Sequence, residues 1–370
     1  MTRAVELAQV ASDGVSEAFK NRIINGAMVI DQRNAGASVT ITSNSTYTLD
    51  RWVANMNQAS KFSVQQNAGS VTPPAGFTNY LGVTSLSAYS IGSSDILAMS
   101  HNIEGLNVAD FAWGTANAKT VTLSFWVRSS LTGTFGGALR NSATNRSYPF
   151  TYTINSVNTW EYETITIPGD TSGTWLTNND IGIRIAFGLG VGSSVSGTAG
   201  SWSGSNLWSA TGATSVVGTN GATFYITGVQ LEVGSQATSF ETRSYGTELA
   251  LCQRYYETAF PVGTAVSPGA SYFWYTNVTS YSSTACRSQW IDFKSTKRAL
   301  PTVTPYRTNI VASNDNSWAV YTLNGWNNSS SVTNCYSTHH GFYAEVTSSD
   351  MGGIGYSYLC IGAWAASAEL

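Results

Sequence analysis

Apolar residues recur at every second position through much of this chain. In the clearest stretch, alternate positions from Val121 to Val127 hold valine, leucine, phenylalanine and valine, and the positions between them are mostly polar. Successive side chains of a β-strand point to opposite faces, so this spacing gives a strand one apolar face. Such runs, separated by turn signals such as Asn220-Gly221, predict an all-β protein of antiparallel sheets.

One later run changes phase in its middle. Between residues 222 and 233, Phe224 and Ile226 share one phase, whereas Val229, Leu231 and Val233 share the other. Gly228 lies at the change of phase. A β-bulge at this glycine would bring all five apolar side chains to one face, so we expect one long strand with a bulge.

The composition excludes several classes of protein. Charged residues make up 11% of the 370 residues, against roughly 25% in an average soluble protein. The chain also has 12 Trp and 19 Tyr, which argues against a mostly helical or disordered chain. The net charge of −3 argues against a nucleic-acid partner. No apolar run is long enough to span a bilayer, so we expect no membrane insertion.

Three parts of the chain are expected. Residues 1–24 form an N-terminal segment with a short helix, residues 25–244 a sandwich domain, and residues 245–370 a smaller antiparallel β domain. The last domain opens with a second helix near residues 245–257, for which Thr247 could provide the cap. The Gly/Ser/Thr-rich stretch 188–221 contains tryptophans, so we expect a loop decorating the sandwich rather than a linker.

The four cysteines lie in the last third of the chain, and none is in a C-x-x-C pair. The first residues lack the pattern of a signal peptide, which favours synthesis in a reducing cytoplasm. We therefore expect free and mostly buried thiols at Cys252, Cys286, Cys335 and Cys360.

Six segments of the chain carry a resemblance to known proteins. They are Asn21-Arg22-Ile23-Ile24-Asn25-Gly26-Ala27-Met28, Asp31-Gln32-Arg33, Asp50-Arg51-Trp52, Gly228-Val229-Gln230-Leu231-Glu232-Val233-Gly234, Ala237-Thr238-Ser239-Phe240-Glu241 and Cys252-Gln253-Arg254-Tyr255-Tyr256-Glu257. These segments resemble parts of bacteriophage tail-fibre and virion proteins. The outline of residues 25–245 is also similar to jelly-roll carbohydrate-binding modules, in which an Asn-Gly start and a late Val-Gln-Leu-Glu strand lie on paired strands.

The resemblance implies a structural virion protein, a tail fibre that binds a host cell-surface polysaccharide for adsorption. Its expected location is the virion tail, after assembly in the cytoplasm of the bacterial host. It also implies a homotrimer. The N-terminal segment would attach it to other tail or virion proteins, and the C-terminal domain would be the receptor-binding tip.

Aromatic residues outside the apolar phase are the candidate glycan-binding residues. Sugar rings present C–H faces that stack on Trp and Tyr, and each candidate could instead lie in the core or in a subunit interface. The candidates are Trp126, Trp202, Trp208, Tyr272, Trp274, Trp326, Tyr336 and Tyr343.

Two alternatives stay open. A glycan-cleaving tail enzyme would need a pair of carboxylates, and Glu161 and Glu163 share one face of an expected strand. A capsid-decorating protein would have no receptor role. We expect no enzyme activity and no cofactor, since no nucleotide-binding or hydrolase motif occurs. The resemblance leaves room for a structural calcium ion without assigning its ligands.

Overall fold

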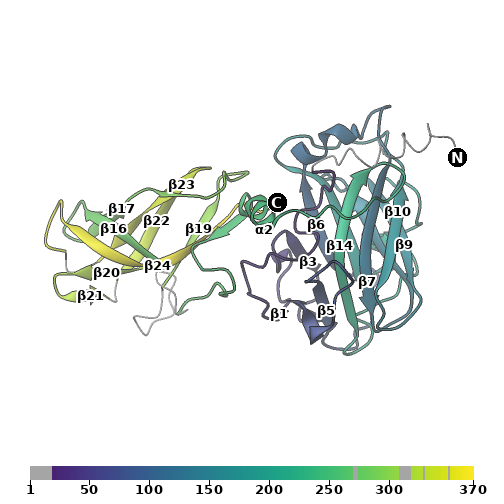
Figure 1. Cartoon of the computed structure of the whole chain (residues 1–370), viewed down its shortest axis with the longest axis horizontal. Coiled ribbons are helices and arrows are strands. Elements are labelled where there is room, and N and C mark those ends of the chain that lie inside the picture. The colour runs from purple at the N-terminus through teal and green to yellow at the C-terminus, as the bar shows by residue number, and fades with distance from the viewer. Residues whose placement is uncertain (1–18, 270–273, 308–317, 328–329, 349–350) are drawn as a thin grey trace.

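The computed structural model describes residues 19–269, 274–307, 318–327, 330–348 and 351–370. Two β domains lie side by side, with the helix α2 (Tyr245–Gln253) between them (Figure 1). The predicted all-β class, a jelly-roll-like sandwich followed by a second antiparallel domain, is confirmed. The N-terminal helix that the sequence predicts falls outside the described residues.

The N-terminal domain consists of two six-stranded sheets packed face to face. The first sheet has the order β1 (Val39–Thr40), β4 (Phe62–Gln66), β5 (Leu81–Ser85), β14 (Thr223–Val233), β7 (Val121–Ser129), β10 (Glu161–Ile167). The second has the order β2 (Thr46–Tyr47), β3 (Trp52–Met56), β6 (Ile96–Glu104), β11 (Ile181–Val191), β8 (Gly133–Arg140), β9 (Ser147–Ile154). Short 3-10 turns lie at Ala68–Ser70, Gly105–Asn107, Ala109–Phe111 and Ser193–Val195, and a small parallel pair joins β12 (Ser196–Gly197) to β13 (Ser209–Ala210).

The alternating residues form the core between the two sheets. Val121, Leu123, Phe125 and Val127 of β7 are all fully buried there, as the period-two pattern predicts. Phe125 lies 5.1 Å from Phe187 of the opposite sheet, measured between ring centroids, in an edge-to-face contact. Aromatic pairs of this kind add to the free energy gained by burying the rings.

The bulge at Gly228 is present. Thr227 pairs with Trp126 and Gln230 pairs with Ser124, so β14 contains one more residue than β7 between the two pairs. Gly228 has a φ of 62°, which a glycine adopts without steric cost. The bulge buries four of the five expected side chains completely, whereas Val233, at the end of the strand, is 39% exposed.

The C-terminal domain is built around the long strand β24 (Ser357–Ser367), which runs toward the other domain (Figure 1). Its first half pairs with β16 (Trp274–Ser280) and β20 (Ala319–Thr322), and its end pairs with β15 (Tyr256–Thr258) and β19 (Thr302–Tyr306). The remaining strands are β17 (Ala285–Ser288), β18 (Ile291–Asp292), β21 (Gly325–Asn327), β22 (Ser331–Ser337) and β23 (Gly341–Thr347).

The second helix is shorter than predicted. It ends at Gln253, and the residues from Tyr256 continue as strand β15, because Tyr256 pairs with Ser367 of β24. The predicted cap at Thr247 is wrong. The N-cap is Ser244, whose hydroxyl accepts a hydrogen bond of 3.3 Å from the main-chain N–H of Thr247.

Candidate functional site

Four of the six segments that carry the sequence resemblance, residues 21–28, 31–33, 50–52 and 252–257, meet where the two domains join. Asn25 is fully buried, and its side-chain amide donates to the main-chain oxygens of Ile30 (2.8 Å) and Asp50 (2.9 Å). Its side-chain oxygen accepts from the Ile30 N–H at 3.0 Å. Its own N–H donates to the Glu248 carboxylate of helix α2. One asparagine thus ties the start of the sandwich to the helix.

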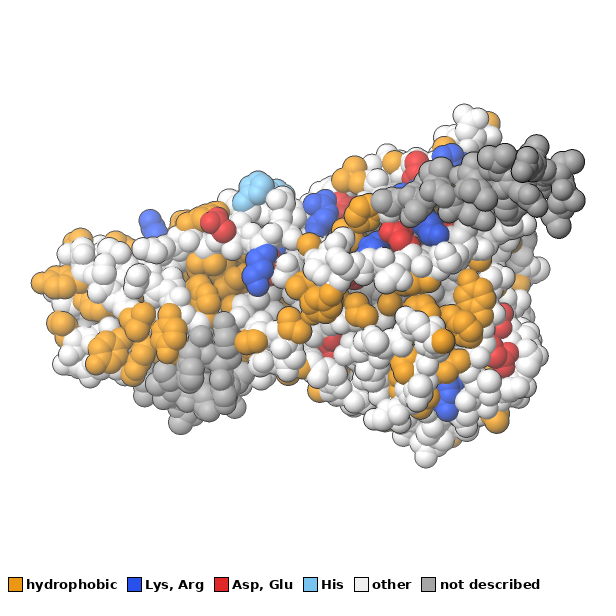
Figure 2. All heavy atoms as spheres, in the orientation of Figure 1, with side chains coloured by type: hydrophobic (Ala, Val, Ile, Leu, Met, Phe, Trp, Pro, Cys, Tyr) orange, Lys and Arg blue, Asp and Glu red, His pale blue; other side chains and the backbone are white. Residues whose placement is uncertain are grey.

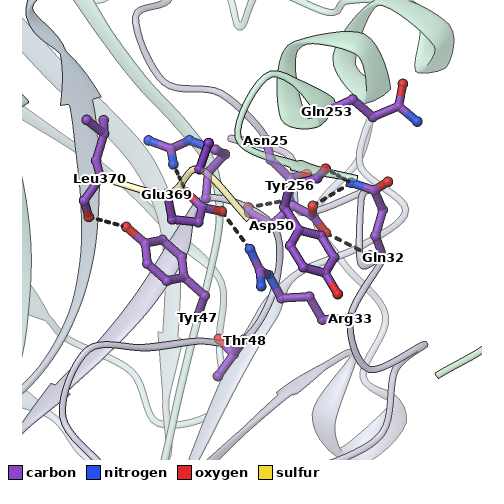
Figure 3. Close-up of polar contacts among 12 residues, drawn as sticks. Asn25, Gln32, Arg33, Tyr47, Thr48, Asp50, Gln253, Tyr256, Glu369 and Leu370 are labelled. Atoms are coloured by element: carbon purple, nitrogen blue, oxygen red, sulfur yellow. Dashed lines mark hydrogen bonds and ion pairs between the residues drawn. The ribbon is translucent and has the colours of Figure 1, made fainter. Parts of the chain in front are cut away.

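A second part of this junction surrounds Asp50 (Figure 3). Gln32 donates to the Asp50 carboxylate from its main-chain N–H and from its side-chain amide, both at 2.7 Å. The same amide donates to the main-chain oxygen of Tyr256, at the start of the C-terminal domain, at 2.9 Å. Burial raises the pKa of Asp50 to about 6, although the charge of Arg33 and the hydrogen bonds from Gln32 act against this rise.

The end of the chain completes the junction. The Glu369 carboxylate accepts from Arg33 at 2.7 Å and from Arg51. Each guanidinium also stacks on a tyrosine, with Arg33 3.6 Å from the ring centroid of Tyr256 and Arg51 3.6 Å from that of Tyr255. Charged side chains gather near this boundary in the space-filling view (Figure 2). These residues hold the domains together through their hydrogen bonds and ion pairs, although the Nε atoms of Arg33 and Arg51 have no hydrogen-bond partner among the described residues.

A groove lies on the outer face of the first sheet. Its floor contains Trp126 of β7 and Tyr162 of β10, with ring centroids 5.2 Å apart. Phe77 and Phe240 form its wall in an edge-to-face contact with centroids 5.1 Å apart. Ser124, Gly228, Ala237, Thr238 and Ser239 line the rest of a hollow of about 440 Å³. We call this hollow the aromatic groove.

The bulge in β14 shapes the aromatic groove. A Cβ atom on Gly228 would lie 2.6 Å from the Phe77 ring and 3.1 Å from the Trp126 ring. A larger residue there would therefore push the Phe77 and Trp126 rings apart. The positive φ of this glycine gives a second reason why a side chain is disfavoured.

A smaller cavity of about 240 Å³ adjoins the aromatic groove and shares Phe77 and Phe240 with it. Gly26, Ala27 and Val29 line its apolar side. Its polar wall holds Glu241, Arg243 and Glu248, but Glu241 already accepts 2.7 Å and 2.9 Å hydrogen bonds from the main chain of Asn21 and Phe19. Because Glu248 belongs to helix α2, the cavity extends the groove toward the domain junction.

Two of the eight candidate aromatics pack against other side chains of the N-terminal domain. Trp202 lies 5.3 Å from Trp113 and 5.5 Å from Trp175 between ring centroids, and its indole N–H donates to the Pro168 oxygen at 2.9 Å. Trp208 is only 9% exposed. The Gly/Ser-rich stretch folds back onto the sandwich, where the Trp208 ring is buried and the Trp202 ring is half-buried. Neither ring lines the aromatic groove.

The candidates of the C-terminal domain have different environments. Trp274 is half-buried and packs 5.4 Å from Trp318, so it belongs to the edge of the core. Trp326 packs 5.2 Å from the exposed ring of Tyr321. Tyr272 lies outside the described residues.

Two tyrosines of this domain form a ladder on its outer face. Tyr336 and Tyr343 pair across β22 and β23 and stack with centroids 4.9 Å apart and an interplanar angle of 23°. Arg287 lies 5.0 Å from the Tyr343 centroid and forms a 2.8 Å ion pair with Glu345. Apolar side chains are also visible at this end of the molecule (Figure 2). This ladder is the second exposed aromatic surface among the candidates.

The carboxylates considered for catalysis lie on the wrong face of β10 for the aromatic groove. Glu163 pairs with Phe125, and Glu161 with Val127, both core residues, whereas Tyr162 between them pairs with Trp126. Burial acts to raise the pKa of Glu161, but hydrogen bonds from Asn155 and the Ser156 N–H lower it overall. Burial and the charge of Glu161 raise the pKa of Glu163. The pair therefore flanks the sandwich edge and not the groove.

The described residues contain no group of three or more His, Cys, Asp or Glu side chains arranged to hold a metal ion. The same part of the chain has no helix long and apolar enough to cross a membrane. The four cysteines are free, and three of them are buried. Burial raises the pKa of the Cys286 thiol to about 12 and that of Cys335 to about 11.

Sequence analysis missed Phe77, Tyr162 and Phe240 as groove residues. Tyr162 carried a usable signal, because it occupies the polar phase of its strand between Glu161 and Glu163. Phe77 and Phe240 lie in loops separated by more than half of the sandwich sequence. Their contact follows from the fold and has no local pattern.

The fold and these surfaces define a two-domain β protein with an aromatic groove on its sandwich. No protein-family model matches the chain, and no curated protein matches it. Solved structures with a general likeness include a phage tailspike domain, an enzyme and several carbohydrate-binding modules.

Three of these structures illustrate the likeness. The enzymatically active domain of tailspike protein 4 from bacteriophage CBA120 has a TM-score of 0.34 and 12% identity, covering 58% of this chain and 22% of its own. An arabinose-bound α-L-arabinofuranosidase has a TM-score of 0.31 and 16% identity, covering 55% and 26%. A family 11 carbohydrate-binding module from Clostridium thermocellum, in complex with a mixed-linked tetrasaccharide, has a TM-score of 0.26 and 12% identity, covering 54% and 97%. The chain thus spans about a quarter or less of the first two, and likeness at these values decides neither family nor function.

Proposed function

We propose that this protein is a structural appendage protein of a bacteriophage virion that binds a cell-surface glycan, and that the aromatic groove is its glycan-binding site. The observation that carries the proposal is the contact between the half-buried Trp126 ring and the exposed Tyr162 ring on the floor of a hollow of about 440 Å³. Binding sites for small ligands are concave and mostly apolar, with a few polar groups that set orientation.

The chemistry of the groove suits a sugar. The rings of Trp126 and Tyr162 provide flat apolar surfaces for the C–H face of a pyranose, while Ser124, Thr238 and Ser239 place hydroxyls at the margin. Tyr162 is 45% exposed, so a ligand can reach the floor. No carboxylate is among the residues that line this hollow, which favours binding without cleavage.

The tail location, the homotrimer and attachment through residues 1–24 are parts of the same proposal. They are supported by the segments that resemble virion proteins. The rival roles are a glycan-cleaving tail enzyme and a capsid-decorating protein.

The test compares binding of surface polysaccharides by the purified protein and four variants. Trp126→Ala removes the larger ring of the floor and should weaken binding per site by about fivefold to tenfold, because one aromatic contact contributes roughly 1 kcal/mol. Trp290→Ala is the matched control, since Trp290 is 45% exposed but lies in the C-terminal domain. Trp126→Phe should restore most of the affinity.

Two outcomes would contradict parts of the proposal. If Tyr343→Ala abolishes binding and Trp126→Ala does not, the tyrosine ladder is the binding site and the groove is not. Release of new reducing ends from the polysaccharide would identify an enzyme instead. Imaging of virions carrying the labelled protein separates a tail appendage from a capsid-decorating protein.

A further inference from the structure

Two arginines lie side by side on the outer face of the second sheet of the sandwich. Arg140 of β8 and Arg184 of β11 are paired residues on neighbouring strands, so their side chains leave the sheet on the same face. The residues next to them, Leu139 and Ile185, are fully buried in the core. The two guanidinium groups therefore point away from the core. They lie on the opposite side of the sandwich from the aromatic groove.

These guanidinium groups lack counter-charge. Within the described part of the chain, neither arginine forms an ion pair. Arg140 is 1% exposed, and its Nε and Nη1 atoms have no hydrogen-bond partner among the described residues. The Nε of Arg184 is also buried without a partner there. Burying a charge without pairing it costs free energy.

The pKa values of both arginines are lowered, which agrees with this shortage of negative charge. Burial, followed by the charge of Arg184, lowers the pKa of Arg140 to about 9. Burial also lowers the pKa of Arg184, although the charges of Tyr47 and Asp180 act in the other direction. Asp180 is thus near enough to influence Arg184 but forms no ion pair with it.

The folded-back stretch covers Arg140 from the solvent side. The Trp208 ring stacks on the Arg140 guanidinium, with the Cζ atom of Arg140 3.7 Å from the ring centroid. The indole N–H of Trp208 is a further buried donor without a partner among the described residues. The Arg140 Nη2 donates to the side-chain oxygen of Asn206, an exposed residue. The Asn206 side chain therefore lies between Arg140 and the solvent, and its oxygen is a neutral acceptor for the guanidinium.

We propose that Arg140, Arg184 and Trp208 form an oxyanion-binding site, which takes a carboxylate or sulfate group after the Asn206 side chain moves aside. A guanidinium offers five N–H donors in a planar fork that matches the oxygens of such a group. The unpartnered N–H groups of the three residues supply donors without an acceptor, which is the complement of an oxyanion. The group can belong to an acidic sugar or to a free inorganic ion.

Calorimetric titration of the full chain tests the proposal with three probes: sodium glucuronate, sodium sulfate and neutral glucose, at constant ionic strength. We expect saturable binding of glucuronate, sulfate or both, and none of glucose at this site. Binding of glucuronate identifies an acidic sugar as the source of the oxyanion, and binding of sulfate alone identifies an inorganic ion. Arg184→Gln, at a half-buried position, should weaken this binding about tenfold or more, because hydrogen bonds to charged groups are strong.

Two further variants make the test independent of folding defects and of the aromatic groove. Arg128→Gln removes an arginine from the outer face of the other sheet and should bind as the parent does. Trp126→Ala should also retain anion binding, so the two sites can fail separately. Asn206→Asp places a carboxylate beside Arg140, and should raise the melting temperature while abolishing binding of the added anion.

The proposal is overturned if neither anion binds the parent protein, or if Arg184→Gln binds with unchanged affinity. A melting temperature of Asn206→Asp at or below that of the parent would likewise show that Arg140 has no unmet need for negative charge.

Discussion

Replacing the fully buried Asn25 by alanine should strongly destabilise the protein. The substitution removes three buried hydrogen bonds, two to Ile30 and one to Asp50. Each buried partner left unsatisfied costs at least roughly 1 kcal/mol, which gives about 3 kcal/mol in total. Asn25 also has a φ of 61°, and an alanine in this left-handed conformation costs roughly 1 kcal/mol more. We expect a loss of about 4 kcal/mol in the free energy of unfolding.

Two matched variants divide this loss into its parts. Asn25→Gly removes the same hydrogen bonds but tolerates the positive φ, so it should cost about 3 kcal/mol, or roughly 1 kcal/mol less than alanine. Asn158 is exposed and has a φ of 58°. Asn158→Ala should therefore cost only about 1 kcal/mol, which is the conformational part alone.

Urea denaturation followed by tryptophan fluorescence measures all three losses, provided that the slope with urea stays constant across the series. The hydrogen-bond argument is refuted if Asn25→Ala costs no more than Asn158→Ala. The conformational argument is refuted if Asn25→Gly is as damaging as Asn25→Ala.

Three other predictions concern ionisable groups. The pKa of Asp50 is raised to about 6 in the folded protein, so the folded state binds its proton more tightly than the unfolded state does. The protonated Asp50 therefore stabilises the fold below the unfolded pKa near 4, and this contribution is lost as the pH rises through about 6. The change in the free energy of unfolding is about 3 kcal/mol at most. The stability of Asp50→Asn relative to the parent should rise over this range. Lys297 and Glu257 form a buried 2.6 Å ion pair. Lys297→Met should therefore lower the free energy of unfolding, measured by urea denaturation, by about 3–5 kcal/mol. Adding Glu257→Gln should recover part of that loss, because it removes the unpaired charge. All four thiols should alkylate without reductant once the chain is denatured, and in the native protein Cys335 should react first because it alone is half-buried; mass spectrometry that finds two unlabelled cysteines would contradict the free-thiol assignment.

Local pattern predicted the strands well. The alternation in β7 and the change of phase at Gly228 both reflect a property of neighbouring residues, the direction of each side chain along an extended chain. The bulge followed from the same rule, because only an extra residue could return Val229 and Leu231 to the buried face. The end of α2 did not follow, since Tyr256 leaves the helix to pair with Ser367, more than a hundred residues away.

The aromatic candidates show where local pattern stops. Trp126 and Trp202 looked alike as aromatics outside an apolar phase, yet one forms the floor of a groove and the other packs against two further tryptophans. The path of the loop around Trp202 decides this difference, and a loop's path depends on contacts with distant strands.

The sequence by itself determined the all-β class, the strand faces, the bulge and the groups of residues that resemble virion proteins. Only the tertiary structure decided that four of these groups meet at one junction, that Phe77 and Phe240 meet beside Trp126, and that Arg140 and Arg184 lie side by side. The physical reason is the range of the interactions. The pattern along a strand depends on residues two apart, whereas Asn25 and Glu248 meet across 223 residues, and such a meeting depends on how every intervening strand pairs.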